Sequence, residues 1–491
     1  MTESIPVRVR FAPSPTGRFH IGGARTALYN YLLARQTGGQ FILRIEDTDR
    51  KRFDPAAEQE YMESLRWLGI EWDEGPDVGG PCAPYRQSER TKIYQQHAEQ
   101  LVQRGSAYYC FCSPDRLAQM REEQQARKEP PHYDGLCRRL SVAEAKARVD
   151  SGETYVIRFK TPRDGVTNAV DTIRGEITFE NETIDDYILL KSNGLPVYHL
   201  AAMVDDHLME ITHVFRGLEW LPTFPLHVLI YQAFEWKQPH WVHLSVFLNP
   251  SGKGKMSKRQ VGNKEIYVFE LRDAGYIPEG LNNWIALMGW SYDDHTEFFT
   301  MQDLIDKFSI EKLSPSSAAV NYGKLDHFNG LHIRALPTSE LSKRIHPLFE
   351  AAGYKIDEKR LDQITPIIQE RIHTLDEAVD LAGFFFQETI DPTPIELVGK
   401  NMTAQESTQA AKAAYEVIEA QTSLEIESLE SALRSLADSL GLKAGQLFGI
   451  LRIAVTGQRV SPPLIESMVI VGKETVLNRI EVAIRLLEDQ E

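Results

Sequence analysis

Apolar and charged residues alternate over residues 7–11, a pattern typical of a short β-strand. Apolar positions then recur at helical spacing from about residue 22 to residue 35, and Gly38 and Gly39 end the expected helix. Residues 41–45 are again apolar and predict a second strand. A strand, a glycine-containing turn, a helix and a strand make a βαβ unit, so the sequence predicts a parallel sheet near its start.

The pattern is less regular farther along the chain. We expect Ser88 to cap a helix that runs to residue 104 and stops at Gly105. Residues 106–190 mix turns, charged runs and short alternating segments, and we interpret them as an insertion. Strand-like patterns return at residues 194–204 and 211–215, and residues 249–255 have the composition of a loop.

Beyond residue 330 the pattern is helical almost throughout. Pro392 and Pro394 mark a predicted boundary between two helical halves. At roughly 150 residues per domain the prior is about three domains, and four or five small domains also fit this length.

Composition narrows the class of protein. The formal net charge of −16 argues against nonspecific coating of nucleic acid, because phosphate binding favours Lys and Arg. A basic strip on an acidic body can still bind RNA. The cysteines are spaced poorly for a disulfide framework, so a reducing compartment fits; they are Cys82, Cys110, Cys112 and Cys137. Residues 1–10 contain no apolar signal core, and charges interrupt every later apolar stretch, so we expect a cytoplasmic protein without a membrane span.

Residues 13–23 join the first predicted strand to the first helix and contain His20, Gly22 and Gly23. A helix N-terminus offers unpaired backbone N–H groups and the positive end of the helix dipole to an anion. Glycines let a ligand approach the backbone closely, and His20 can donate a hydrogen bond to a phosphate oxygen. Taken alone, the same residues also fit an ordinary glycine turn with a surface histidine.

A second basic segment spans residues 255–259 and contains Lys255 and Lys258. Gly252 and Gly254 precede it, so a hinged loop is expected. Lysines on such a loop suit closure over a polyphosphate, because the ammonium group is a point charge on a flexible stem. Taken alone, the segment also fits a solvated basic loop.

In this order along one chain, the two segments resemble the two signature motifs of class I aminoacyl-tRNA synthetases. Wider strings resemble glutamyl-tRNA synthetases, namely residues 12–17 (APSPTG), 44–49 (RIEDTD), 198–201 (YHLA) and 204–207 (VDDH). The resemblance covers essentially the whole chain and is densest over residues 8–260.

A glutamate site must neutralise two carboxylates and one ammonium group, since buried charges need partners. Arg10 ends the first predicted strand and Arg216 follows a later one, and arginine binds carboxylates bidentately. Glu46 ends another strand and can take the substrate ammonium. Ligands sit at the carboxyl ends of parallel strands, so these side chains are expected to face one crevice. An alternative is that Arg10 and Glu46 form a structural ion pair.

The resemblance implies site residues position by position. Glutamate contacts are implied for Arg10, Ala12, Ser14, Glu46, Tyr198 and Arg216. ATP contacts are implied for His20, Gly22, Gly23, Glu219, Trp220, Lys255 and Lys258. Two positions depart from the family pattern: Ala202 stands where asparagine is usual, and Leu218 where an acidic residue is common. These departures put fine specificity in doubt more than the class of reaction.

The implied reaction is an in-line attack of the glutamate α-carboxylate on the α-phosphorus of ATP, followed by transfer of the glutamyl group to tRNA. The attacking group is already an anion, so catalysis should rest on positioning and charge stabilisation. His20 and Lys258 are assigned to the phosphate charge and Lys255 to loop closure, with Mg²⁺ bridging phosphates. The implied partners are L-glutamate, ATP and tRNA(Glu), with tRNA(Gln) as an open alternative, and the family expectation is a monomer without an editing domain.

Three thiols lie close together in sequence at Cys110, Cys112 and Cys137, and thiolates are preferred ligands of structural zinc. Some family members have a histidine two residues after the last cysteine, where this chain has Arg139. Related enzymes instead pair Cys-x-Cys with Tyr-x3-Cys, a form that Tyr133 fits. The alternative to zinc is a set of free thiols.

The expected fold is α/β: a Rossmann-like catalytic domain with an insertion, followed by an all-helical anticodon-binding region. The expected boundaries are 1–105 and 191–250 for the catalytic halves, 106–190 for the acceptor-stem insertion, 251–330 for the lysine loop and stem contact, and 331–394 and 395–491 for the helical parts. The helical region also fits a bundle that serves only stability or docking. Other rivals are a nucleotidyltransferase with the same histidine turn and a non-catalytic tRNA-binding protein on this scaffold.

Overall fold

The computed structural model describes residues 6–256 and 266–490. The chain divides into two compact units. The first contains Met1–Glu270 and Asn282–Asn321, and the second contains Leu271–Leu281 and Tyr322–Glu491. Each unit has its own hydrophobic core, so each is described by itself.

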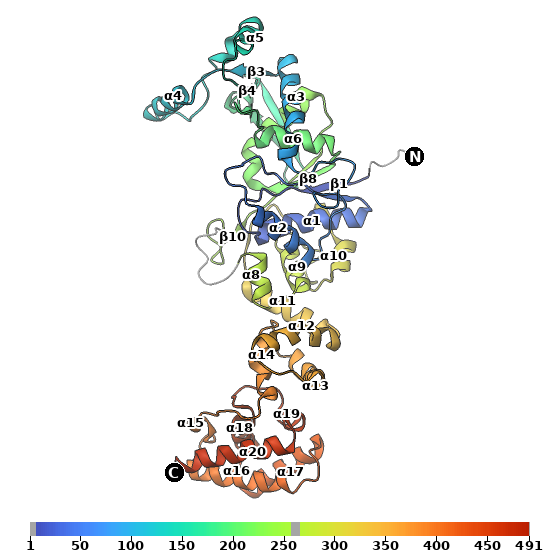
Figure 1. Cartoon of the computed structure of the whole chain (residues 1–491), viewed down its shortest axis with the longest axis vertical. Helices are drawn as coiled ribbons and strands as arrows, with labels where there is room; N and C mark the ends of the chain where they lie inside the picture. The colour runs from blue at the N-terminus through green and yellow to red at the C-terminus, as the bar shows by residue number, and fades with distance from the viewer. Residues whose placement is uncertain (1–5, 257–265, 491) are drawn as a thin grey trace. The chain divides into compact units, whose positions relative to one another are not determined.

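A mixed sheet with the strand order β2-β1-β8-β9-β5-β6 organises the first unit (Figure 1). Its strands are β1 (Arg8–Phe11), β2 (Gln40–Leu43), β5 (Val166–Asp171), β6 (Gly175–Glu180), β8 (His213–Gly217) and β9 (His240–Leu244). Neighbouring strands from β2 to β5 run parallel, and only the β5–β6 pair is antiparallel. The predicted parallel sheet is therefore confirmed.

The predicted βαβ unit is also confirmed. Between β1 and β2 lies α1 (Ile21–Thr37), whose apolar positions are buried against the sheet. Gly38 ends this helix with a φ of 63°, a left-handed conformation that glycine adopts at low cost, and its N–H caps the last turn.

Two local predictions are wrong. Residues 194–204 do not form a strand, because the helix α6 (Tyr198–Leu208) occupies most of this segment. Residues 200–206 are all buried, so no polar face reveals the helical period in the sequence. Ser88 does not cap the next helix: it lies in a 3₁₀ turn, Gln87–Arg90, and Arg90 is the N-cap of α3 (Thr91–Gln103).

The segment expected as an insertion contributes to two sheets. Strands β3 (Ala107–Cys110), β4 (Val156–Phe159) and β7 (Ile188–Leu190) form a separate antiparallel sheet that carries α4 (Pro114–Ala126) and α5 (Val142–Asp150). Strands β5 and β6 instead extend the main sheet beside β9. The boundaries proposed for the inserted domain thus stay a prediction, with the β5–β6 pair as the part that joins the catalytic sheet.

The remaining elements complete this part of the chain. They are α2 (Pro55–Trp67), α7 (Phe224–Phe234), α8 (Val268–Asp273), α9 (Pro278–Leu287) and α10 (Met301–Lys307), with a short parallel pair of β10 (Phe247–Leu248) and β11 (Ala318–Ala319). Residues 249–255, predicted to be a loop, form turns between β10 and a bridge at Lys255.

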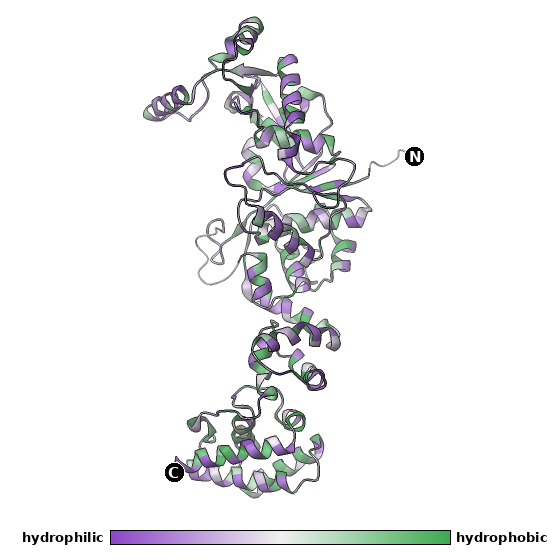
Figure 2. Cartoon of the chain, viewed as in Figure 1, coloured by the Kyte–Doolittle hydropathy of each residue, from purple (hydrophilic) through white to green (hydrophobic). Residues whose placement is uncertain are grey.

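The second unit is helical, as predicted for the chain beyond residue 330. Its helices are α11 (Tyr322–Ala335), α12 (Thr338–Ala351), α13 (Glu358–Gln369), α14 (Glu377–Ala382), α15 (Pro394–Leu397), α16 (Ala404–Glu419), α17 (Ile426–Ser439), α18 (Ala444–Thr456), α19 (Leu464–Val471) and α20 (Lys473–Glu488). Hydrophobic and hydrophilic stripes share the long helices α16, α17 and α20, as Figure 2 shows, and the apolar stripes form a common core. Among the described residues, no helix is long and apolar enough to cross a membrane.

Candidate active site

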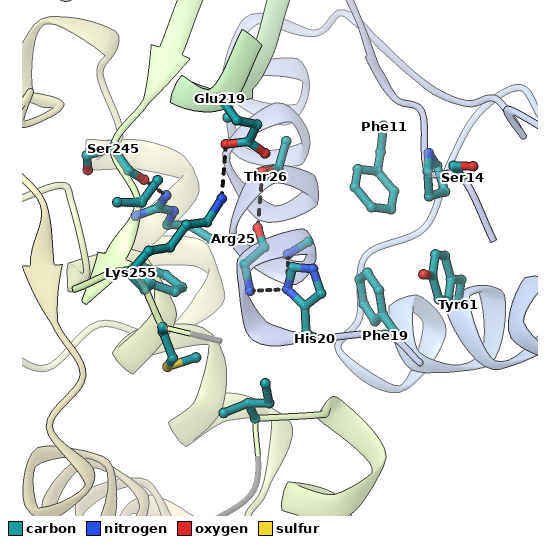
Figure 3. Close-up of a pocket in the computed structure, with 18 residues that line it drawn as sticks. Phe11, Ser14, Phe19, His20, Arg25, Thr26, Tyr61, Glu219, Ser245 and Lys255 are labelled. Carbon is teal, nitrogen blue, oxygen red and sulfur yellow. Dashed lines mark hydrogen bonds and ion pairs between the residues drawn. The ribbon is translucent and has the colours of Figure 1, made fainter. Parts of the chain in front are cut away.

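The strand order places a crevice at the carboxyl end of β1. The chain leaves β1 through α1 to reach β2 on one side, and β8 lies on the other side of β1. Crevices of parallel sheets form at such a reversal. Phe11 ends β1 and Gly217 ends β8, and both line a cavity of about 600 Å³ (Figure 3).

His20 closes the N-terminus of α1 at one wall of this cavity. Its Nδ1 accepts hydrogen bonds from the backbone N–H groups of Gly22 and Gly23, at 3.1 and 3.2 Å (Figure 3). Because Nδ1 accepts, the neutral ring carries its proton on Nε2, where it can donate to a ligand. A Cβ on Gly23 would lie 2.8 Å from the ring of Phe19, so this turn has room only for glycine.

Lys255 and Glu219 face each other across the same cavity. The Lys255 Nζ lies 3.7 Å from a carboxylate oxygen of Glu219, and both side chains are more than half exposed (Figure 3). An exposed pair of this kind contributes little stability, so the lysine can exchange its partner for a ligand anion. Gly217 makes room for the pair, because a Cβ there would meet the Glu219 carboxylate at 2.3 Å.

The chain on both sides of residues 257–265 is anchored at this cavity. Met256 and Ile266 line it, and the Met256 N–H donates to the Phe247 carbonyl at 2.8 Å. The Ile266 carbonyl accepts a hydrogen bond of 2.9 Å from the N–H of Ile21, in the first turn of α1. The predicted ATP contact Lys258 lies outside the described residues.

Arg25 is a cavity residue that the sequence reasoning missed. It lies one turn into α1 and is buried; its guanidinium donates to the carbonyls of Met288 and Ser245 and stacks 4.0 Å from the Phe247 ring centroid. Burial lowers the pKa of this guanidinium. An arginine among the apolar positions of a predicted helix was the signal that could have revealed it.

A buried cluster of charges adjoins the cavity, beside β1 and β8. Arg10 holds Asp206 with a bidentate fork at 2.9 and 3.2 Å and donates to the Phe215 carbonyl at 3.1 Å. Arg44 donates to the same Asp206 at 2.7 Å and to Glu46 at 3.0 Å. The suggested Arg10–Glu46 ion pair is therefore not formed: Arg10 pairs with Asp206, and Arg44 pairs with both Asp206 and Glu46.

The protonation of the two carboxylates follows from these partners. Burial raises the pKa of Glu46, although Arg44 and Arg10 oppose the shift. Burial acts the same way on Asp206, but its contacts with Arg10 and Arg44 outweigh it and hold the pKa of Asp206 below its usual value. The two arginines thus favour the ionised form of Asp206, whereas for Glu46 they do not fully offset the cost of burial.

Arg216 lies in the same region, at the carboxyl end of β8. Its Nε donates to Nε2 of His243 at 2.9 Å, and its Nη1 bonds Nδ1 of His227 at 2.7 Å. Burial lowers the pKa of Arg216, and the neighbouring Tyr198 acts in the opposite direction. The Tyr198 ring stacks on Trp220 with centroids 4.0 Å apart.

The structure therefore groups the predicted residues in two adjoining sets. Ser14, His20, Gly22, Gly23, Glu219 and Lys255 line the open cavity. Arg10, Glu46 and Arg216 are buried beside it, and Tyr198 joins them to Trp220. Ala12 directly follows β1.

Ala202, the departure from the family pattern, is fully buried on α6. Tyr198, Ala202 and Asp206 are spaced four residues apart and so share one face of this helix. Ala202 therefore points toward the buried cluster without offering it a polar group.

The sulfur cluster is assembled as the sequence suggested. The sulfurs of Cys110, Cys112 and Cys137 lie within 4.8 Å of one another, and Cys112 and Cys137 are 3.6 Å apart. The Tyr133 hydroxyl lies 3.4 Å from Cys110 and 3.3 Å from Cys112. All four cysteines of the chain are free thiols, so no disulfide competes for these atoms.

Comparison with known proteins agrees with this geometry. The family model for the catalytic domain of class I tRNA synthetases (E and Q) matches residues 6–327, and a model for an anticodon binding domain matches residues 340–484. The parallel sheet, the histidine-capped helix and the crevice between them thus define the catalytic domain of a class I tRNA synthetase.

Individual relatives narrow the class further. The chain is 47% identical over 488 residues to the glutamate–tRNA ligase of Dehalococcoides mccartyi, which covers 98% of this chain and 99% of the relative. A protein of the same name from Chloroflexus aurantiacus is 45% identical over 498 residues, covering 99% and 98%. The crystal structure of a glutamate tRNA ligase from Elizabethkingia meningosepticum in complex with its amino acid superposes with a TM-score of 0.89 at 36% identity, covering 98% of this chain and 99% of that one. The chain belongs to the glutamate–tRNA ligase family.

Proposed function

We propose that this protein activates L-glutamate with ATP and transfers the glutamyl group to tRNA(Glu). One observation carries the proposal: the N-terminus of helix α1 and the exposed Lys255 line one cavity, beside buried arginines and a buried glutamate. The first set suits a polyphosphate and the second suits an amino acid with two carboxylates.

In the first step, an oxygen of the glutamate α-carboxylate attacks the α-phosphorus of ATP. The new bond joins this oxygen to phosphorus, and the bond from phosphorus to the pyrophosphate oxygen breaks. The nucleophile needs no base, so the chain contributes position and charge. His20 Nε2–H and the Lys255 ammonium would donate to phosphate oxygens, where negative charge is highest. Mg²⁺ would accompany the phosphates as part of the nucleotide substrate and neutralise their charge.

Amino-acid selection would fall to the buried cluster. Glu46 is placed to accept the substrate ammonium, and Arg216 to bind a carboxylate, with Arg10, Ala12, Ser14 and Tyr198 completing the wall. A hydrophobic side chain would leave Arg216 desolvated without a counter-charge, which costs several kcal/mol, on the order of 2–5. Charge alone can therefore select the substrate, and no editing site is required.

In the second step, a terminal ribose hydroxyl of tRNA would attack the glutamyl carbonyl carbon, and AMP would leave. The helical second unit would read the anticodon, in line with the anticodon-binding model that matches there. Residues 106–190 would hold the acceptor stem, and the helical part would divide at 394/395. We expect a cytoplasmic protein. We also expect a monomer, and size-exclusion chromatography with light scattering would test the oligomeric state.

The sulfur cluster would hold a structural zinc ion. In a tetrahedral site with Zn–S bonds of about 2.3 Å, neighbouring ligand atoms lie about 3.5–3.8 Å apart. The distances of 3.6 Å between Cys112 and Cys137 and 3.3–3.4 Å from the Tyr133 hydroxyl fit this requirement. Cys110, Cys112, Cys137 and Tyr133 would close the site, so the metal would fix the small sheet and take no part in catalysis.

Aminoacylation of purified tRNA(Glu) and tRNA(Gln) with radiolabelled glutamate tests the proposal. We expect ATP-dependent labelling of tRNA(Glu); labelling of tRNA(Gln) would extend the substrate range to the second acceptor. A pyrophosphate-exchange assay without tRNA would show whether activation needs bound tRNA, as the family resemblance implies. Labelling of neither tRNA, with well-folded protein, would refute the proposed function. The same assay tests Lys258, since Lys258→Ala should lower turnover more than glutamate binding.

A further inference from the structure

Arg216 differs from Arg10 and Arg44, the other arginines of the buried cluster, in the kind of partner it has. Arg10 and Arg44 donate to carboxylates of Asp206 and Glu46 at 2.7–3.2 Å. Arg216 donates instead to imidazole nitrogens, and among the described residues no carboxylate lies within ion-pair distance of it. A buried cation without a counter-charge is costly unless something else orients and receives its charge.

One of the two imidazoles is locked in a single tautomer by an acid. Asp171 ends β5, and its Oδ2 accepts hydrogen bonds from His243 Nδ1–H at 2.7 Å and from the His243 backbone N–H at 2.9 Å. Since Nδ1 carries the proton, Nε2 carries the lone pair that receives Arg216 Nε–H at 2.9 Å. Asp171, His243 and Arg216 thus form a chain of hydrogen bonds across β5, β9 and β8.

The second imidazole is fixed from the helix side. Arg216 Nη1 bonds Nδ1 of His227 on α7 at 2.7 Å, so His227 must carry its own proton on Nε2. That nitrogen lies 2.9 Å from Nδ1 of His199 on α6, which can accept its hydrogen bond. Burial lowers the pKa of His227, of His243 and of His199, so all three rings are neutral acceptors or donors here.

The remaining nitrogen of the guanidinium has no partner within the described part of the protein. The Nη2 atom is buried and has no hydrogen-bond partner among the described residues. The guanidinium also lies over the Trp241 ring, with Cζ 4.7 Å from the ring centroid. His243, His227 and Trp241 therefore hold the guanidinium in place, Tyr198 lies beside it, and Nη2 is the nitrogen without a hydrogen-bond partner in the described chain.

We propose that His243 and His227 are positioning residues that orient Arg216 without neutralising it, so that a substrate carboxylate supplies the missing counter-charge. The inference rests on the proposed function and adds to it the source of amino-acid affinity. Neutral imidazoles accept hydrogen bonds as carboxylates do, but they carry no charge to compete with the ligand. Asp171 acts through His243, because it decides which ring nitrogen accepts.

The test places acceptor atoms at the position of each ring nitrogen. In His243→Gln the side-chain oxygen can lie near the lost Nε2, and in His227→Asn near the lost Nδ1. The mirror variants His243→Asn and His227→Gln carry the same groups at the wrong reach, and His243→Leu and His227→Leu carry no acceptor. His213→Gln is the control, since His213 is a half-buried histidine in the same strand β8 that bonds Thr212 instead.

We expect the Leu and mirror variants to raise KM for glutamate about tenfold or more, with KM for ATP changed less than about twofold. His243→Gln and His227→Asn should recover most of the loss, and His213→Gln should match the unsubstituted protein. Asp171→Asn should behave like His243→Leu. Its amide NH₂ group cannot accept a hydrogen bond, and it would face either His243 Nδ1 or the N–H groups of Ile173 and Arg174, which now donate to Asp171.

Melting temperatures separate positioning from folding. If the Leu variants fail to fold, the test rests on comparing His243→Gln and His227→Asn with the mirror variants. Equal glutamate KM values in those two groups, or a parallel rise in both KM values, would overturn the inference. Loss of glutamate-dependent activity in the unsubstituted protein would refute the proposed function instead, so the two failures are distinguishable.

Discussion

The buried arginines of this site reach different electrostatic states through their neighbours. Arg44 is fully buried, and nearby carboxylates of Asp206, Asp205 and Glu46 raise its pKa further, despite the cost of burial. Burial instead lowers the pKa of Arg216, which lies among imidazoles. Arginine therefore serves as part of a structural ion pair at position 44, whereas at position 216 it lacks a counter-charge that a bound anion could supply.

At this scale, replacing Arg216 by glutamine tests the carboxylate assignment. Glutamine keeps a donor but removes the charge, so a bound carboxylate would lose its counter-ion in a buried place. We expect KM for glutamate to rise about 100-fold, equivalent to about 2.7 kcal/mol, with little change in KM for ATP. Arg35→Gln, on the surface beside Asp73, is the control. Normal glutamate affinity in Arg216→Gln would show that the assignment is wrong.

Lys255 is a second residue with a clear expectation. Its ammonium pairs weakly with Glu219 across the cavity and is free to meet a polyphosphate. Lys255→Ala should lower kcat/KM for ATP about tenfold or more and leave KM for glutamate nearly unchanged. Lys253→Ala, two residues earlier in the same loop and also exposed, should have no such effect. Equal losses in both variants would point to the charge of the loop as a whole.

At the scale of elements, the first turn of α1 connects local geometry to ligand binding. The His20 side chain accepts hydrogen bonds from two N–H groups of this turn, and these N–H groups could otherwise donate to a phosphate. An incoming phosphate therefore has to compete with the histidine ring or bind beside it, at Nε2. The glycines permit either arrangement because no Cβ blocks the turn.

Alanine substitutions of glycines at the two ends of α1 should separate an effect on ATP use from an effect on stability. In Gly23→Ala the new Cβ would lie 2.8 Å from the buried Phe19 ring, so the turn or the ring must shift. We expect a loss of about 1–3 kcal/mol in unfolding free energy and a clear fall in kcat/KM for ATP. Gly38→Ala, at the other end of α1, meets no atom within 4 Å and suffers only from its φ of +63°. It should cost about 1 kcal/mol and leave kinetics unchanged, as denaturant titration and steady-state assays would show.

The small sheet of β3, β4 and β7 should depend on metal. If the three thiols and Tyr133 hold zinc, elemental analysis of purified protein will find about one equivalent. Cys137→Ser should lose most of it and become more sensitive to proteolysis between β3 and β4. Cys82→Ser, which removes a thiol outside the cluster, is the matched control. Less than a tenth of an equivalent in the unsubstituted protein would leave four free thiols as the correct description.

At the scale of the whole molecule, buried histidines should make stability depend on pH. Burial lowers the pKa of His199, His213 and His332 from 6.5 to about 4. The unfolded chain therefore binds more protons than the folded one between these values, and stability falls as pH drops from 6.5 toward 4. Above pH 6.5 this contribution is fully present. Side-chain hydrogen bonds lower the pKa of Asp303 to about 2, so the stability that this residue contributes is lost only at lower pH.

Melting curves at several pH values check this expectation. The melting temperature should be flat above about pH 7 and decline steadily below about pH 6. His213→Gln should show a shallower decline, since it removes one of the groups that takes up a proton on unfolding. A melting temperature that stays constant down to about pH 5 would contradict the proposed cause.

The molecule combines an acidic chain with a function that we assign to tRNA. The net charge of −16 made nonspecific nucleic-acid binding improbable from composition, and it leaves shape and local charge to select the partner. Separate family models match the catalytic part, residues 6–327, and the helical part, residues 340–484.

The sequence by itself determined the features that depend on near neighbours. The alternation at residues 7–11, the helical spacing that follows and the glycine at its end fixed β1, α1 and the C-cap Gly38, because strand and helix periods are local properties. The three cysteines were likewise recognised from their closeness in sequence and Tyr133 from the family resemblance, and the four side chains do come together. The strand prediction for residues 194–204 was wrong, because a helix that is buried on all sides shows no hydrophobic period.

Only the tertiary structure decided which charges are paired. Arg10 and Asp206 are 196 positions apart, and Arg216 and His243 are 27 apart on neighbouring strands, so neither pair falls within the window of about 11–18 residues that reveals periodicity. Sequence left open whether Arg10 pairs with Glu46; folding gave Arg10 to Asp206 and Glu46 to Arg44. Electrostatic energy depends on distance in space and on burial, and both are set only when the strands β1, β8 and β9 lie side by side.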